Sequence, residues 1–178
     1  QGTRVTITGD RLNGGGSEVV AVTLGGNAVE QIVSESSVSV EVIAPAGVSV
    51  VGYTDLSDTV LTASSGAVVT LENSWGFVNS SIDTITPDHG QVGVRVTIAG
   101  YQMFGHHQSI GRSIDTVHLA GTQAEIVSES QTEIVVVATS GAAGVGTVLV
   151  TTDTGARVTL ANGFTYDAES SISLGTPA

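Results

Sequence analysis

The pentapeptide Ile-Val-Ser-Glu-Ser occurs twice in the chain, at residues 32–36 and 126–130. A serine beside a carboxylate could act as a nucleophile, but it would also need a general base and a group that stabilises an oxyanion. No histidine accompanies either copy in the sequence. Serine is also a favoured turn residue, so we interpret both copies as strand ends followed by turns rather than as duplicated active sites.

A second candidate for chemistry is the histidine pair His106 and His107, in the segment FGHHQSIGR at residues 104–112. These histidines could bind a transition metal together with His89 or His118, although their spacing matches no metal-ligand signature. The segment is not a nucleophile elbow, because no glycine stands two residues before its serine. For His118, which alternates with apolar residues, a position on the surface of a strand is favoured.

Acidic residues gather near the boundaries of two repeated units, at Asp83, Asp88, Asp167 and Glu169. Calcium takes several oxygen ligands, so these carboxylates are candidates for a calcium site between units. The chain contains no D-x-D-x-D-G loop. A solvated acidic hinge is the alternative, and the general exposure of charged residues favours it.

Asn79 opens the triplet Asn-Ser-Ser in the connector between the units. This triplet is an acceptor sequence for N-glycosylation, and in a secreted protein it would mark an exposed loop. The expectation therefore depends on secretion.

The charge balance excludes several classes of function. The 178 residues include no lysine, and five arginines face 17 carboxylates, which gives a formal net charge of −12. Binding to nucleic acid or to an anionic membrane needs clustered cations, so neither is expected. Without cysteine there is no thiolate chemistry, and without lysine the glycine-rich GAAGVGT at residues 141–147 cannot be a phosphate-binding loop. No apolar run is long enough to span a membrane, and a leader, if the protein is secreted, is expected outside this segment.

An internal repeat organises the chain. GTRVTITG at residues 2–9 returns as GVRVTIAG at 93–100, and SGAVVTLEN at 65–73 returns as TGARVTLAN at 154–162. We also match the later GFV at 76–78 with GFTY at 163–166. The repeat predicts two domains, at residues 1–79 and 80–169, and the initial strand of the first is expected to be missing or truncated in this segment.

Residues 170–178, SSISLGTPA, resemble SSIDTITPD at 80–88. This match predicts that 170–178 begin a further repeat or a linker, and that the chain is part of a longer array.

Hydrophobic residues alternate with polar ones within each unit, which predicts β-strands. The apolar fraction of 40% contains only 4% aromatics, and abundant Val, Ile and Thr also favour strands. Short strands separated by Gly-rich turns predict an all-β chain of two antiparallel β-sandwiches. The core is expected to contain Val5, Ile7, Val22, Leu24 and Ile32 in the first unit and Val96, Ile98, Val117, Leu119 and Ile126 in the second.

The order of these motifs resembles the IPT/TIG domains: G-x-x-V-T-I-x-G, then V-x-L-G-G, I-V-S-x-S, G-x-x-V-T-L and a closing G-F-x-Y. The resemblance covers nearly the whole chain, twice. It implies immunoglobulin-like, early-set sandwiches of the kind found in tandem in cell-surface and secreted proteins. An extracellular or cell-surface location is therefore expected, with the neighbouring repeats and other copies of the chain as partners.

Two kinds of function remain. We predict a non-catalytic structural or adhesive segment of a long surface protein or filament, without cofactor unless calcium binds. The alternative is a module that recognises a carbohydrate or a protein through the loops at 48–60 and 101–113, which do not repeat. The candidate contacts of that alternative are Tyr53, Tyr101, Phe104 and His106.

Overall fold

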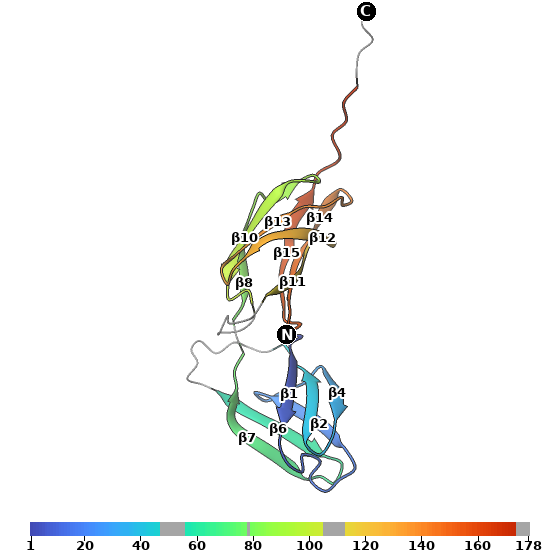
Figure 1. The fold of residues 1–178 in the computed structure, drawn as a ribbon, viewed down its shortest axis with the longest axis vertical. Helices are drawn as coiled ribbons and strands as arrows, with labels where there is room; N and C mark the ends of the chain where they lie inside the picture. Colours follow the sequence, from blue (N-terminus) through green and yellow to red (C-terminus); the bar gives the residue numbers. More distant parts are fainter. Residues whose placement is uncertain (47–55, 78, 105–112, 174–178) are drawn as a thin grey trace, which may run out of the picture.

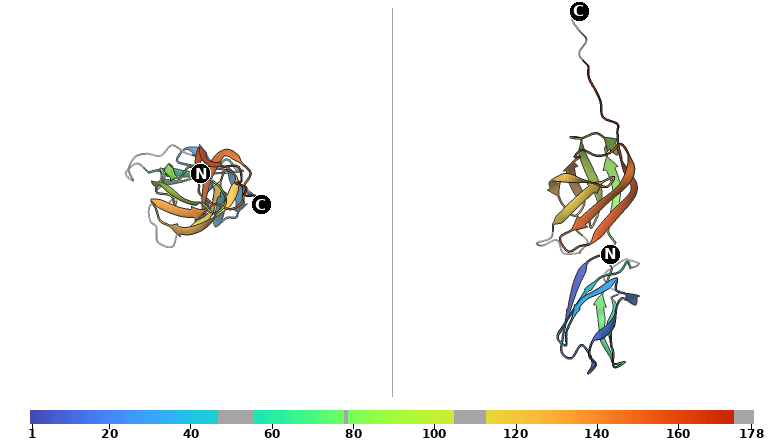
Figure 2. Two further views of the ribbon diagram at one scale, coloured as in Figure 1. Left: turned by 90° about the horizontal axis from the view of Figure 1, so that it is seen from above. Right: turned by 90° about the vertical axis from the view of Figure 1, so that its right-hand side faces the viewer.

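The computed structural model describes residues 1–46, 56–77, 79–104 and 113–173. Every regular element in these ranges is a β-strand. They contain no helix that is long and apolar enough to cross a membrane. The strands form two sandwiches stacked end to end, with residue 1 near the junction between them (Figures 1 and 2). The predicted all-β class is confirmed.

The first sandwich has two separate sheets, in the orders β1-β5-β4 and β3-β2-β6-β7. All of its strand pairs are antiparallel. Its strands are β1 (Arg4–Thr8), β2 (Val19–Leu24), β3 (Asn27–Ala28), β4 (Gln31–Glu35), β5 (Ser39–Ile43), β6 (Ser57–Ala63) and β7 (Val68–Trp75).

In the second sandwich one long strand, β12, pairs with both layers, so its strands are hydrogen-bonded in the single series β8-β10-β13-β12-β11-β14-β15-β9. Only the β15–β9 pair is parallel among these pairs. The strands are β8 (Ser81–Thr86), β9 (His89–Gly90), β10 (Arg95–Tyr101), β11 (Ile114–Leu119), β12 (Thr122–Glu129), β13 (Glu133–Val137), β14 (Gly144–Thr152) and β15 (Arg157–Tyr166).

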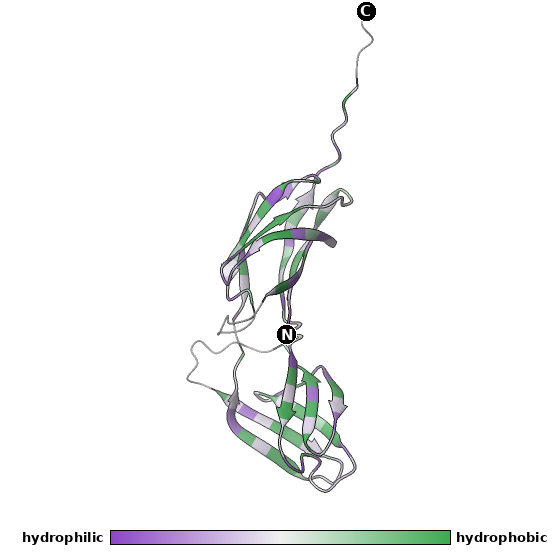
Figure 3. Cartoon of the chain, in the orientation of Figure 1, coloured by the Kyte–Doolittle hydropathy of each residue, from purple (hydrophilic) through white to green (hydrophobic). Residues whose placement is uncertain are grey.

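The period-two pattern fills a core in each sandwich, and hydrophobic and hydrophilic residues are interleaved along the strands in Figure 3. Of the residues expected in the core, six are buried, namely Val22, Leu24, Val96, Ile98, Val117 and Leu119. Four are half-buried and pack against the edge of a core, namely Val5, Ile7, Ile32 and Ile126.

An aromatic pair recurs at the same place in both sandwiches. Trp75 and Phe77 meet edge to face with ring centroids 5.7 Å apart, and Phe164 and Tyr166 do so at 5.2 Å. The strand register agrees, because Trp75 lies opposite Ser57 as Phe164 lies opposite Gly146.

The register corrects the match of GFV with GFTY by two positions. Leu71 pairs with Thr59 as Leu160 pairs with Val148, and Asn73 and Asn162 both adopt a positive φ. The structural counterpart of Phe164 is therefore Trp75, not Phe77. The letters Gly-Phe suggested the other alignment because the first sandwich has a tryptophan where the second has a phenylalanine.

We expect Trp75→Phe to change the free energy of unfolding by less than about 1.5 kcal/mol, because a phenylalanine already occupies this position in the second sandwich. The indole Nε1 is buried without a hydrogen-bond partner among the described residues, so little is lost with it. Trp75→Ala should cost about 2–4 kcal/mol, since it leaves a cavity beside Phe77. Urea unfolding followed by circular dichroism measures both, and equal losses would contradict the assignment.

Candidate functional site

The glutamate of each IVSES copy joins two strands. The Oε2 atom of Glu35, at the end of β4, accepts a hydrogen bond of 3.1 Å from the backbone N–H of Val19, where β2 begins. Glu129, at the end of β12, accepts one of 3.0 Å from the N–H of Ile114, where β11 begins. Both carboxylates therefore serve as acceptors for the first backbone donor of a neighbouring strand.

The serine that follows each glutamate closes a turn. The Oγ atom of Ser36 donates to the carbonyl oxygen of Ser39 at 3.1 Å and accepts from its N–H at 3.0 Å. Ser130 makes the same two bonds with Glu133, at 3.0 and 2.9 Å. The interpretation of IVSES as a strand end followed by a turn is confirmed.

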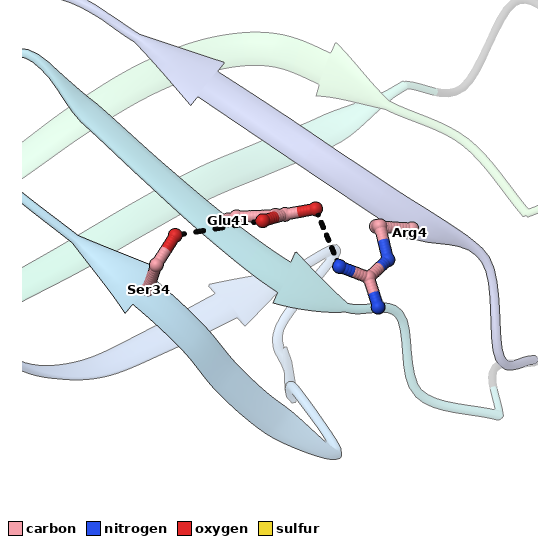
Figure 4. A network of polar contacts seen from close by, with 3 residues as sticks. All are labelled: Arg4, Ser34 and Glu41. Atoms are coloured by element: carbon pink, nitrogen blue, oxygen red, sulfur yellow. Dashed lines mark hydrogen bonds and ion pairs between the residues drawn. The ribbon is translucent and has the colours of Figure 1, made fainter.

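The other serine of the first copy, Ser34, lies in a polar row across the outer face of sheet β1-β5-β4 (Figure 4). Its hydroxyl is 3.5 Å from Oε2 of Glu41, at the limit of a hydrogen bond, and Oε1 of Glu41 lies 2.8 Å from Nη1 of Arg4. The Arg4 side chain is 58% exposed, so solvent screens this ion pair. The row supports pairing across the sheet, and its one carboxylate, Glu41, is already engaged by Arg4.

The four acidic residues considered for calcium do not converge on one point. Asp83 lies within β8 and accepts a 2.7 Å hydrogen bond from Ser81, whereas Asp88 follows the other end of that strand. The backbones of Asp88 and Asp167 approach each other through β9, because Asp88 accepts from Thr165 and Asp167 donates to Gly90. Within the described part of the chain no group of three His, Asp or Glu residues could hold a metal ion.

One small electrostatic site remains at the end of the second sandwich where β9 meets β15. Nδ1 of His89 lies 3.0 Å from Oδ1 of Asp88, and both side chains are exposed. The hydrogen bond to Asp88, with the negative charge of Asp167 as the next cause, raises the pKa of His89 above its ordinary value. The same hydrogen bond, together with one from the backbone, lowers the pKa of Asp88.

The candidate contacts in the variable loops have different positions. Tyr53, His106 and His107 lie outside the described residues. Tyr101 is 53% exposed at the end of β10, while Phe104 is 7% exposed and packs in the second core. Burial of Phe104 thus assigns it to packing and does not support the surface contact expected from the sequence.

Asn79 is exposed in the connector between β7 and β8, as a glycan acceptor would have to be. The next residue of its triplet, Ser80, donates a hydrogen bond of 2.9 Å to the carbonyl oxygen of Gln102. Whether a sugar is attached stays a prediction.

A junction that the sequence did not indicate joins the two sandwiches. The N–H of Arg4 donates to the carbonyl oxygen of Thr154 at 3.0 Å, and the N–H of Arg157 donates to that of Gln1 at 3.1 Å. These bonds connect the start of β1 with the turn between β14 and β15. We call residues 1–4 and 154–157 the joint. Nothing in the sequence pattern marks it, because its bonds are made by backbone atoms alone.

Comparison with known proteins identifies the family of both sandwiches. The model of the IPT/TIG domain matches residues 1–73 and 80–166. The chain belongs to the IPT/TIG family. The resemblance inferred from the motifs is confirmed, and each of its two units is an IPT/TIG domain.

Similar solved structures are much longer than this chain. A mixed-linkage glucan utilization protein, SGBP-B of Bacteroides ovatus, solved with a mixed-linkage heptasaccharide, is 20% identical over 93% of this chain and 42% of its own, with a TM-score of 0.39. The plexin A4 extracellular region is 16% identical over 94% of this chain and 14% of its own, with a TM-score of 0.49. No curated protein matches. The IPT/TIG pair thus spans less than half the length of these structures.

The strand-joining role of Glu129 predicts a loss of stability on Glu129→Ala. Removing the carboxylate leaves the N–H of Ile114 without its acceptor, which should lower the free energy of unfolding by about 1–2 kcal/mol. Glu125→Ala, at an exposed position of the same strand, is the matched control and should have little effect. Calorimetric unfolding compares the two, and equal shifts would contradict the role of Glu129.

The pair of Asp88 and His89 predicts a titration that NMR can follow. The ring protons of His89 should titrate above 6.5, and Asp88→Asn should lower this pKa more than Asp167→Asn, following the order of the two causes. Because the pKa is raised by folding, the stabilisation is present below about pH 6.5 and disappears as the pH rises through the raised value. The urea-unfolded chain is the control, and an unchanged His89 midpoint in Asp88→Asn would refute the assignment.

Proposed function

We propose that these two IPT/TIG domains form a non-catalytic structural spacer within an extracellular or cell-surface protein. The joint carries this proposal, because backbone hydrogen bonds in both directions hold one sandwich directly against the next. Such bonds restrict rotation about the connector and fix the spacing of the two domains. The extracellular location is supported by the family, whose domains occur in tandem in cell-surface and secreted proteins.

Two glycines allow the joint to close. Gly2 and Gly155 have φ values of 83° and 82°, which glycine adopts at little cost. A Cβ atom on Gly2 would lie 2.6 Å from the carbonyl oxygen of Gly155, and one on Gly155 would lie 2.9 Å from that of Gly2. The two backbones therefore meet at a distance that only glycine permits on both sides.

The repeat provides an internal control for this argument. Gly93 and Gly66 occupy the positions equivalent to Gly2 and Gly155, with φ values of 86° and 84°, but a Cβ on either would meet nothing within 4 Å. Glycine is thus needed at all four positions for the turn itself. Only Gly2 and Gly155 are needed for close contact between domains as well.

The surface chemistry supports a spacer rather than a reaction centre. Both glutamates of the IVSES copies and the serine that follows each of them are engaged in backbone bonds, as Glu35, Ser36 and Glu129 illustrate. The net charge of −12 makes separate chains repel one another and so keeps them in solution. A spacer has to stay soluble and extended, and both requirements agree with this charge.

We expect Gly155→Ala to loosen the joint and Gly66→Ala to leave it intact. Both changes place alanine at a positive φ and should destabilise their own sandwich by about 1–2 kcal/mol. The chain has no cysteine, so spin labels can be attached at Val68→Cys and Val145→Cys, two exposed positions in different sandwiches. Pulsed electron resonance should give a narrow distance distribution that Gly155→Ala broadens.

A broad distribution already in the parent protein would contradict the spacer. In that case recognition through the variable loops, for which the exposed Tyr101 is available, would be the better account. An equal broadening by Gly66→Ala would show that the effect comes from lost stability and not from the joint.

A further inference from the structure

The β14–β15 turn of the second sandwich, which lies in the joint, has the same backbone hydrogen bonds as the β6–β7 turn of the first. The N–H of Thr152 donates to the carbonyl oxygen of Ala156, and the N–H of Gly155 donates to that of Thr152, both at 2.9 Å. The first sandwich repeats both bonds at the same lengths in the turn at residues 63–67. The β6–β7 turn therefore shows which residues the turn itself requires.

Thr152 adds side-chain bonds that the first sandwich lacks at this position. Its Oγ1 atom accepts a hydrogen bond of 3.1 Å from the N–H of Ala156 and lies 2.9 Å from Oγ1 of Thr154. The equivalent residue is Ala63, which has no hydroxyl group. Thr152 is only 2% exposed, and a buried hydroxyl group needs hydrogen-bond partners. The Thr152 side chain therefore fixes the turn from inside the sandwich.

The turn that Thr152 fixes presents an acceptor to the first sandwich. The carbonyl oxygen of Thr154 accepts the 3.0 Å bond from the N–H of Arg4 across the joint. Because the hydroxyl group of Thr154 is also tied to Thr152, its carbonyl group is already held in place when the neighbouring strand docks. An acceptor that is ordered in advance costs less entropy when the bond forms. Thr152 thus acts on the joint through Thr154.

Arg157 covers the start of the first sandwich with its side chain. Its Nε and Nη2 atoms lie 3.0 and 3.3 Å from the point where a Cβ atom on Gly2 would lie. The guanidinium group therefore packs over the backbone of Gly2, and the N–H of Arg157 donates to Gln1 beside it. At the equivalent position the first sandwich has Val68, which is 60% exposed. A valine is tolerated at this place, so the fold of a sandwich does not require the arginine.

We propose that Thr152 and Arg157 adapt the β14–β15 turn to dock the first strand of an adjacent IPT/TIG domain, and that the turn accepts only a strand with glycine at the position of Gly2. Thr152 is a positioning residue, and Arg157 touches the partner domain directly. A Cβ atom on residue 2 would lie 2.6 Å from the carbonyl oxygen of Gly155 and would also meet the guanidinium group of Arg157. The surface therefore excludes residues larger than glycine.

This inference rests on the spacer function and names the residues that select the partner domain. Gly2 and Gly155 allow the close approach, but Gly66 is present at the equivalent place in the first sandwich and has the same backbone conformation. Glycine alone therefore does not distinguish the two turns. The side chains of Thr152 and Arg157 do, because the first sandwich has neither of them.

The spin-label pair at Val68→Cys and Val145→Cys tests both residues in the full chain. Thr152→Ala and Arg157→Val each introduce the residue that the first sandwich has at that position. Each should broaden the distance distribution, because the joint loses an ordered acceptor or a covering side chain. A narrow parent distribution that both variants leave unchanged overturns this inference and leaves the spacer intact, whereas a broad parent distribution overturns both.

Two controls separate the joint from effects of charge and of stability. Arg95→Val removes the same charge from an exposed strand position of the second sandwich and should leave the distribution narrow. Ile134→Val shortens a fully buried side chain, so it should lower the unfolding midpoint without changing the width. Broadening by either control to the extent seen with Arg157→Val would refute the inference.

Hydrogen exchange of the Arg4 amide measures the joint without labels. This N–H donates across the joint, so both Thr152→Ala and Arg157→Val should raise its exchange rate about tenfold. The N–H of Gly9 bonds to Val38 within the first sandwich and should keep its rate. An Arg4 amide that exchanges at the parent rate in both variants would show that neither side chain holds the joint.

Discussion

Each backbone N–H group needs a hydrogen-bond acceptor, and this requirement shapes the structure wherever a strand begins or ends. Strand interiors satisfy that need through the ladders. At the first residues of β2 and β11 the carboxylates of Glu35 and Glu129 supply the acceptor, and at the joint the carbonyl oxygens of Thr154 and Gln1 do so.

Equivalent positions have the same local role in the two IPT/TIG domains. Their surroundings differ between the domains. Gly2 and Gly93 have the same backbone conformation, yet only Gly2 touches the next domain. Trp75 packs edge to face on Phe77 as Phe164 does on Tyr166, yet of Trp75 and Phe164 only Phe164 is fully buried. Divergence between the repeats therefore lies mainly in what surrounds each sandwich and less in how it folds.

Several side chains that the sequence singled out for chemistry instead serve local structure. Of the carboxylates that suggested a calcium site, Asp83 lies in β8 and Asp88 follows it, whereas Asp167 and Glu169 follow β15. The serines that suggested a nucleophile, Ser36 and Ser130, close turns. What remains distinctive is the direct contact between the domains at the joint. This contact concerns how the two domains are connected.

The sequence by itself determined the all-β class, the two repeats, the family and part of the core, since six of the ten residues expected there are buried. Alternation of apolar and polar residues is a local property, and a repeat can be read by comparison of short segments, so neither requires distant contacts. Comparison of the two repeats misaligned the aromatic pair, because identical residues in two segments do not reveal the strand register. Sequence analysis put Phe104 among the surface contacts, because a single aromatic residue in a loop has no pattern that shows its burial.

Only the tertiary structure decided the joint and the donors that Glu35 and Glu129 accept from. Each of these depends on backbone atoms that come together from distant parts of the chain. Every residue carries the same N–H and C=O groups, so the sequence holds no signal that tells which of them will meet.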